Sequence, residues 1–229
     1  MTIKICYTTI MPYKDTRDFE VITAGAATLD IFVLSKRLLL MKSARFSNGV
    51  GECLSLGSKM EVDDLHFASG GGASNAAATF SSLGFRTAIF AEVGDDIGAE
   101  HVKDELLTHK IRDFSYRNEN QKTALSIILA VPSSDRAILT YRGASAEFSA
   151  GHFPFSSTTA QTYYVTSLRG NISGYSSILD RAESLGSRVA WNPGSSEFEL
   201  GHAKLLPFLK RTQFLVLNRE EAALFTKSD

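Results

Sequence analysis

Apolar residues follow two different periods along this chain. Short β-rich runs, typical of buried strands, alternate with longer runs whose apolar residues recur every three to four positions, typical of amphipathic helices. Strands are predicted over 19–25, 86–93, 161–168, 188–191 and 212–217, and helices over 97–109, 173–185 and 200–210, with a last helix beginning at Asn218. Strands that alternate with helices predict an α/β fold in which a parallel sheet carries helices on its faces.

Two segments interrupt this alternation. Residues 31–68 hold short apolar runs separated by polar, glycine-bearing stretches, which predicts a small β-sheet outside the main one. Such a sheet is either a flap over a site, a structural insertion or a dimer edge. Two further β-rich runs, 122–131 and 136–141, predict a hairpin around Pro132-Ser133-Ser134-Asp135.

One large domain accounts for most of the chain. The length of 229 residues and the 44% of hydrophobic residues are enough for a substantial core. Residues 1–18 show no core pattern, and we expect a poorly ordered leader there, with Met1 or Met11 as the true start. The predicted domain therefore spans 19–229.

A glycine triplet separates the predicted small sheet from the next helix. Gly70, Gly71 and Gly72 run into a small-residue helix that contains Asn75 and closes at Leu83-Gly84. Consecutive glycines lose much backbone entropy on folding, so they are typical of places that need positive φ or a close approach. The unpaired N–H groups of the first helical turn and the amide of Asn75 suit a hydroxyl-rich or anionic ligand. A flexible turn before a packed helix explains the glycines equally well.

Three polar residues stand where strands end or helices begin. Asp30 follows the first predicted strand, at the edge of an open α/β sheet where ligands bind, so its carboxylate is a candidate for holding substrate hydroxyls. A turn or cap aspartate is the alternative. Asn218 and Glu221, three residues apart, have the spacing of a capping box at the start of the last helix.

Composition excludes several classes of function. The 24 Lys and Arg residues nearly cancel the 25 Asp and Glu residues, so no charge field favours a nucleic acid or an anionic membrane as partner. Two cysteines without redox or metal spacing indicate a reducing compartment. No apolar run reaches the roughly 20 residues that span a bilayer, and no signal peptide is recognisable, so we expect a cytoplasmic protein.

Six motifs, taken in order and spacing, resemble the ribokinase-like (pfkB-type) carbohydrate kinases. They are Gly25-x-x-x-x-Asp30, Gly70-Gly71-x-x-x-Asn75, Gly94-Asp95-Asp96-x-Gly98, Tyr141-Arg142-Gly143-Ala144, Trp191-Asn192-Pro193 and Asn218-x-x-Glu221. The resemblance extends from about Phe19 to the last residue. It implies a doubly wound, mostly parallel sheet with helices on both faces, and it places residues 31–68 at the position of the family's inserted β lid. Because an exposed edge of a small sheet favours pairing with another chain, a homodimer through this lid is a further prediction.

The resemblance also implies a reaction and a set of sugar-binding residues. Such a kinase transfers the γ-phosphoryl group of ATP, with Mg²⁺, to a primary hydroxyl of a sugar or nucleoside. Asp30, Gly70, Gly71 and Asn75 correspond to the residues that hold the sugar hydroxyls. A nicotinamide dehydrogenase is less favoured, because the turn at Gly25 lacks G-x-G-x-x-G.

The nucleotide side follows from the same resemblance. Asn192 corresponds to a residue near the nucleotide phosphates, and Asn218 and Glu221 to a pair that organises phosphate and Mg²⁺, with Glu221 acting on the metal indirectly. The capping box and this role are compatible.

One family signature is missing from the sequence. Asp-Thr-x-Gly-Ala-Gly-Asp, which supplies the catalytic base and the backbone anion hole, lies downstream of Asn-x-x-Glu in the family and does not occur before Asp229. We therefore assign no catalytic residue within this chain, and we expect a C-terminally incomplete sugar kinase. A non-catalytic sugar-binding or regulatory remnant of such a kinase is the alternative.

Overall fold

Six parallel strands form the main sheet of the protein. The computed structural model describes residues 16–46, 48–131 and 135–226, so the predicted leader lies outside the described residues except for its last three positions. Every neighbouring pair in the sheet is parallel. In spatial order the strands are β14 (Phe214–Leu215), β13 (Arg188–Trp191), β12 (Ala160–Val165), β1 (Phe19–Ala24), β6 (Thr87–Phe90) and β8 (Arg112–Asp113).

Helices cover both faces of this sheet. Successive residues of β6 pack into different hydrophobic clusters. Phe90 packs in a cluster with α3 (Ile172–Ser184), whereas Ile89 packs with α1 (Gly72–Ser82) and α2 (Ile97–Thr108). This follows from the strand period of two, which sends neighbouring side chains to opposite faces. The remaining helices are α4 (Ser195–Phe198), α5 (His202–Leu209) and α6 (Arg219–Thr226), with short 3₁₀ turns at Gly143–Ala146 and Ala150–His152. The predicted doubly wound α/β fold is confirmed.

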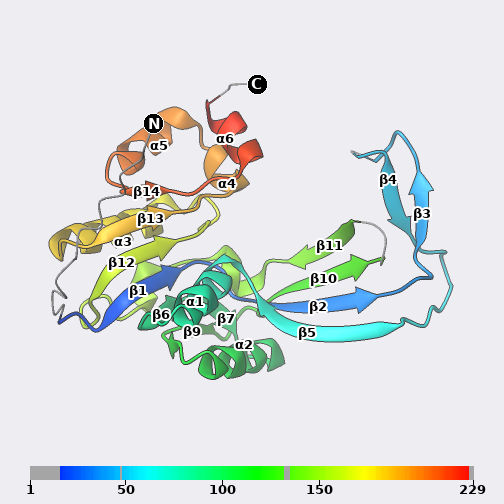
Figure 1. Ribbon diagram of the computed structural model, residues 1–229, viewed down its shortest axis with the longest axis horizontal. Coiled ribbons are helices and arrows are strands. Elements are labelled where there is room, and N and C mark those ends of the chain that lie inside the picture. The colour runs from blue at the N-terminus through cyan, green and yellow to red at the C-terminus, as the bar shows by residue number, and fades with distance from the viewer. Residues whose placement is uncertain (1–15, 47, 132–134, 227–229) are drawn as a thin grey trace, which may run out of the picture.

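A second sheet of four strands projects from the main body (Figure 1). Its spatial order is β11 (Arg136–Tyr141), β10 (Ala124–Ala130), β2 (Thr28–Leu34) and β5 (Asp64–Gly70). The predicted hairpin is confirmed as the antiparallel pair β10–β11, with residues 132–134 outside the described residues. What the pattern did not predict is that this hairpin pairs with β2 and so completes the projecting sheet.

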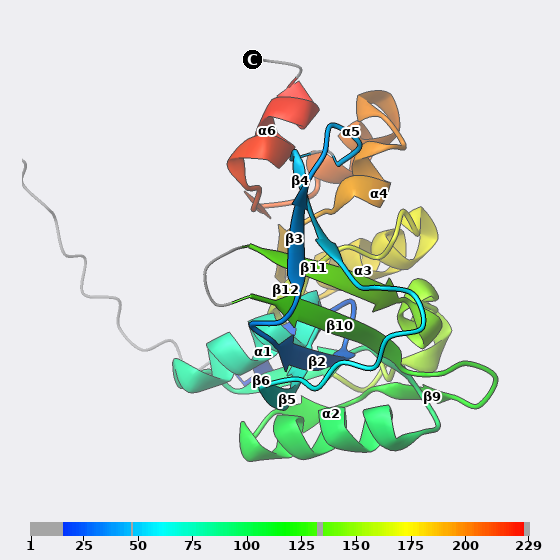
Figure 2. The same cartoon turned by 90° about the vertical axis from the view of Figure 1, so that its right-hand side faces the viewer.

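A two-stranded hairpin ends the projection. Strands β3 (Leu39–Lys42) and β4 (Val50–Cys53) form an antiparallel two-stranded sheet, which lies across the far end of the four-stranded sheet (Figures 1 and 2). Strand β7 (Glu92–Gly94) follows β6 along the chain, and β9 (Tyr116–Asn118) follows β8. These two strands form a separate parallel pair. The predicted strand 86–93 is thus divided at Ala91 between two sheets.

Two expectations about local structure need correction. Asp30 does not lie in a turn after β1 but inside β2, because the chain turns at Gly25 and enters the projecting sheet within three residues. The run 212–217 is not a buried strand: β14 has two residues, and the Phe214 side chain is 52% exposed. Its position explains this, since among the described residues β14 is the edge strand of the main sheet and has β13 as its neighbour on one side.

The predicted helix boundaries at α2 and α3 are confirmed. Asp96 caps α2 by accepting a hydrogen bond from the Ala99 N–H at 3.1 Å. Asn171 does the same for α3 through the Gly174 N–H at 2.9 Å. Within the described ranges no helix is both long and apolar enough to cross a membrane.

Candidate functional site

A polar cavity of about 390 Å³ lies where the main sheet, the projecting sheet and α1 meet. Four of the seven residues singled out from the sequence line it, namely Asp30, Gly71, Asn192 and Glu221. The two that are farthest apart in the sequence, Asp30 and Glu221, are separated by 191 positions. Because the carboxyl ends of parallel strands meet at one edge, β12 and β13 deliver their following loops to the same cavity.

The projecting sheet contributes a row of polar side chains. Asp30 on β2 pairs in register with Ser126 on β10, which in turn pairs with Thr140 on β11, and all three line the cavity. The Asp30 carboxylate accepts a hydrogen bond from the Thr28 hydroxyl at 2.8 Å. A row of one carboxylate and two hydroxyls is suited to binding a polyol, because carboxylate oxygens accept and hydroxyls both donate and accept.

The structure gives a specific reason for each of the three glycines. A Cβ on Gly70 would stand 1.9 Å from an Asp30 carboxylate oxygen, and one on Gly72 would stand 2.9 Å from the Thr166 side chain. Gly71 has φ +91° and would place a Cβ 2.4 Å from the Ala26 carbonyl oxygen. The triplet therefore allows close packing against three different neighbours, and of the three glycines Gly70 is the one that makes room for the Asp30 carboxylate.

Asn75 lies away from the four predicted residues that line the polar cavity. It is exposed on α1, and it is not among the residues that line the polar cavity. Its backbone N–H donates to the Gly71 carbonyl at 3.0 Å, and its carbonyl accepts from the Thr79 hydroxyl at 2.8 Å. Its role toward a sugar stays a prediction.

The pair Asn218 and Glu221 forms the capping box that its spacing predicts. The Glu221 N–H donates to the Asn218 side chain at 2.8 Å, and the Asn218 N–H donates to the Glu221 carboxylate at 2.9 Å. Glu221 lines the polar cavity, whereas Asn218 does not. The Asn192 amide, also at the cavity, donates to the Val216 carbonyl at 2.8 Å and so ties the end of β13 to the segment after β14.

Two arginines at the cavity had no role in the sequence interpretation. Arg142 follows β11, and Arg169 follows β12 with a backbone φ of +59°. Their guanidinium groups are cationic at any physiological pH and bind phosphate or carboxylate in a planar, two-pronged geometry. The Tyr-Arg-Gly-Ala motif contains Arg142, but only the tertiary fold brings it to the same cavity as Arg169.

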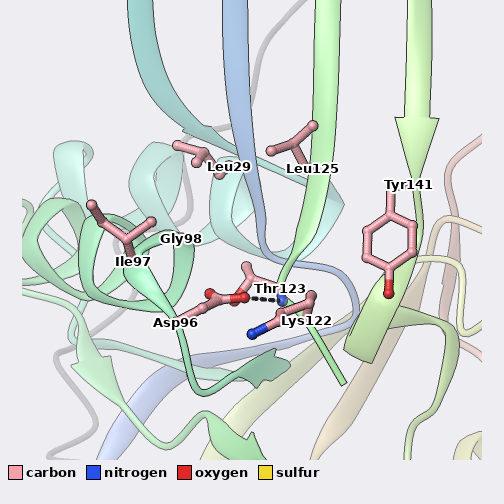
Figure 3. A pocket seen from close by; sticks show the side chains of 8 residues that line it. All are labelled: Leu29, Asp96, Ile97, Gly98, Lys122, Thr123, Leu125 and Tyr141. Carbon is pink, nitrogen blue, oxygen red and sulfur yellow. Dashed lines mark hydrogen bonds between the residues drawn. The ribbon is translucent and has the colours of Figure 1, made fainter. Parts of the chain in front are cut away.

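A second cavity, of about 410 Å³, lies on the reverse face of the projecting sheet. Leu29, Leu125 and Tyr141 form the row next to Asp30, Ser126 and Thr140 and therefore point to the opposite side (Figure 3). Its one carboxylate, Asp96, is bound to the Thr123 N–H at 2.9 Å and to the Thr123 hydroxyl at 2.6 Å.

That carboxylate is a structural group. Burial raises the pKa of Asp96, but hydrogen bonds from Thr123 and Ala99 outweigh it, so the pKa lies below its usual value. The cavity is otherwise lined mainly by apolar groups, and the polar cavity around Asp30 is the better candidate for a hydroxyl-rich ligand.

Two acidic side chains, Asp30 and Glu221, line the polar cavity. Among the residues that the structure describes, no group of three His, Cys, Asp or Glu side chains is arranged to hold a metal ion. Mg²⁺ commonly keeps several waters and takes one or two carboxylates together with substrate phosphates. Glu221 is the acidic residue on the side of Asn192, and one of its oxygens is already engaged by the Asn218 N–H.

Comparison with solved structures identifies kinases of one fold. The adenosine kinase from Sinorhizobium meliloti superimposes with a TM-score of 0.72 at 19% identity, covering 92% of this chain and 68% of that one. The nucleoside kinase from Methanocaldococcus jannaschii gives 0.67 at 18%, covering 91% and 64%. The ribokinase from Cryptococcus neoformans, solved with ADP, gives 0.65 at 17%, covering 94% and 62%. The chain thus spans about two thirds of the length of these proteins.

Two sequence comparisons gave different outcomes. A search of curated proteins found no match, whereas a scan of protein-family models identified a family. The family model described as pfkB family carbohydrate kinase matches residues 43–229, which is most of the chain and includes the glycine triplet, Asn192 and the Asn218–Glu221 pair. The protein therefore belongs to the pfkB family of carbohydrate kinases.

Proposed function

We propose that the protein serves as the acceptor-binding and part of the nucleotide-binding portion of an ATP-dependent kinase that phosphorylates a primary hydroxyl of a sugar or nucleoside. The observation that carries this proposal is the convergence of Asp30, Gly71, Asn192 and Glu221 on one polar cavity. We place this activity in the cytoplasm, where ATP and Mg²⁺ are available.

Each group has a part in such a reaction. The Asp30 carboxylate, in a row with two hydroxyls, fixes the acceptor through its hydroxyl groups. Phosphoryl transfer depends mainly on positioning and charge neutralisation, so holding the acceptor in line with the phosphate is the main contribution of this side.

The loops that follow β12 and β13 carry the groups that suit phosphate. Arg169 and the loop around Asn192 offer donors to phosphate oxygens, while Glu221 orients water on a magnesium ion. When bound, Mg²⁺ neutralises negative charge on the phosphates. The projecting sheet, together with the β3–β4 hairpin, acts as a lid that excludes water from the transferring group.

The test is an assay of phosphoryl transfer. Release of ADP is followed with a panel of sugars, sugar phosphates and nucleosides, using this chain and a chain extended by any coding sequence downstream of Asp229. Because the base-bearing signature does not occur in these 229 residues, we expect turnover only in the extended chain. Robust turnover by the 229-residue chain would contradict this assignment of roles, and an extended chain that contains the signature yet phosphorylates nothing in the panel would contradict the proposed activity.

A further inference from the structure

Glu197 is a fully buried carboxylate that no part of the proposed reaction uses. It lies on α4, is 1% exposed, and accepts four hydrogen bonds. One oxygen accepts from the Leu168 N–H at 2.9 Å and the Gly170 N–H at 2.8 Å. The other accepts from the Ser167 hydroxyl at 2.7 Å and the Gly194 N–H at 2.8 Å. All four donors belong to the loops that follow β12 and β13.

These two loops form one wall of the polar cavity. Ser167 and Arg169 line it from the first loop, and Asn192 and Gly194 line it from the second. Glu197 itself is not among the lining residues, so it acts on a bound group only through the loops that it joins.

The geometry at Arg169 shows what the carboxylate holds in place. The two N–H groups on one oxygen flank Arg169, whose φ of +59° is unfavourable for a residue with a Cβ. The Arg169 N–H donates to the Ser167 hydroxyl oxygen at 3.2 Å, and that hydroxyl donates to Glu197. Strained backbone of this kind persists where surrounding contacts over-determine it.

The second loop is packed with little free space. A Cβ on Gly194 would stand 3.0 Å from the Ser167 side chain, so the two loops touch at this point. Charge-assisted hydrogen bonds to a buried carboxylate are stronger than neutral ones, and a single acceptor that serves both loops fixes their relative position.

We propose that Glu197 is the positioning residue of the anion-binding wall, holding Arg169 and the Asn192–Gly194 loop in the arrangement that receives phosphate oxygens. This inference rests on the proposed function for the identity of the anion as a phosphate group. It assigns to Glu197 no direct contact with that group.

Glu197→Gln tests the inference with little change of shape. Glutamine keeps one acceptor oxygen, and its NH₂ group must face one pair of donors. The Ser167 hydroxyl can rotate to accept from this NH₂, whereas a backbone N–H cannot, so the Gly194 N–H loses its partner. Glu199→Gln is the matched control, because it makes the same charge change on an exposed side chain two residues away.

Amide hydrogen exchange and pyrophosphate binding are measured on both variants. We expect Glu197→Gln to speed exchange at Gly194 by at least tenfold, with smaller increases at Leu168 and Gly170, and to weaken pyrophosphate binding at least tenfold. Because Glu197 acts through Arg169 as well as through the Gly194 loop, its effect on pyrophosphate binding should be smaller in an Arg169→Ala background than in the wild-type chain. Ser167→Ala, which removes one donor and the acceptor of the Arg169 N–H, serves if Glu197→Gln does not fold.

Several outcomes would overturn the inference. They are exchange rates equal to those of Glu199→Gln, pyrophosphate affinity unchanged by Glu197→Gln, additive losses in the double variant, or no pyrophosphate binding by the wild-type chain. A failure of the proposed function is distinct from these, since it is read from the acceptor panel and not from exchange or pyrophosphate affinity.

Discussion

At the scale of single residues, the site depends on one local contact of Asp30 and on one contact with a residue that is distant in sequence. The Asp30 carboxylate accepts a hydrogen bond from the Thr28 hydroxyl, and it fits beside Gly70 because glycine has no side chain. The sequence identified both residues as candidates, but it suggested that the glycine serves a ligand directly. The structure adds that Gly70 makes room for the carboxylate.

Asp30→Ala tests the acceptor role. In an active, extended chain we expect a loss of about 2–5 kcal/mol in acceptor binding or transition-state stabilisation, because a charged acceptor of hydrogen bonds from buried hydroxyls is removed. The measurement is kcat/KM for the best acceptor of the panel. Asp64→Ala, an exposed aspartate on β5 of the same sheet, is the control and should leave it unchanged. An unchanged kcat/KM in Asp30→Ala would exclude the role.

Gly71 offers a test of the close packing with an internal control. Gly71 and Gly84 share a φ of +91°, but a Cβ on Gly71 meets the Ala26 carbonyl, whereas one on Gly84 meets nothing within 4 Å. We expect Gly84→Ala to cost about 1–2 kcal/mol for the left-handed backbone alone. Gly71→Ala should cost about 2–5 kcal/mol, because overpacking adds to it. Denaturant unfolding gives both values, and equal costs would show that the contact with Ala26 is unimportant.

At the scale of elements, helix caps and strand registers arrange the site. The Asn218–Glu221 box starts α6, and the same glutamate reaches the cavity. The register of β2, β10 and β11 separates a polar row that faces this cavity from an apolar row on the reverse side. A slip of one residue in β2 would exchange Asp30 for an apolar neighbour, so the register is part of the site.

The Asp96 cap of α2 predicts a pH-dependent contribution to stability. Asp96→Ala should lower the free energy of unfolding by about 0.5–2 kcal/mol at neutral pH. Because the folded-state pKa is lowered, the contribution is present above the unfolded pKa of about 4 and is lost as the pH falls through the folded value. Denaturant unfolding between neutral and acid pH measures it, with the exposed Asp95→Ala as control. A difference that grows toward acid pH would contradict this assignment.

The β3–β4 hairpin should open more readily than the sheet that carries it. Within the described residues its two strands form a separate two-stranded sheet, and a two-stranded hairpin is less stable than a wider sheet. We expect its amides to exchange much faster than those of β2 and β5, and a bound acceptor to slow them if the projection closes as a lid. Hydrogen exchange with and without acceptor measures this, and uniform slow exchange across the projection would argue for a rigid insertion.

At the scale of the whole molecule, apolar side chains remain exposed at two sheet edges. Leu215 on β14 is 41% exposed and Leu139 on β11 is 60% exposed. Open edges with apolar side chains favour association with further chains. Such contacts bear on the homodimer that we predict through the projecting sheet.

Charge at each edge separates the two kinds of association. We expect Leu139→Glu to dissociate a lid-mediated dimer and Leu215→Glu to reduce aggregation without affecting such a dimer, because each removes apolar area at one edge only. Light scattering coupled to size-exclusion chromatography measures both. If neither variant changes the mass distribution of the wild-type chain, neither edge mediates association.

The sequence alone determined the class of the fold, the caps and most candidate residues. Periodicity fixes the fold class because a strand or helix must place its apolar side chains on one face, and the Asn218–Glu221 box is visible because it satisfies donors within four residues. The kinase resemblance likewise followed from local motifs whose order is visible along the chain.

Tertiary structure alone decided which residues share the polar cavity with Asp30. That Ser126, Thr140, Arg142 and Arg169 join Asp30 depends on the pairing of β10 with β2 and on parallel strands ending together, neither of which leaves a local signal in sequence. Glu197 had none either, since a glutamate in the first turn of a helix reads as a capping residue. The Gly194 N–H is that local capping donor, and only the folded loop after β12 supplies the other three donors around its carboxylate.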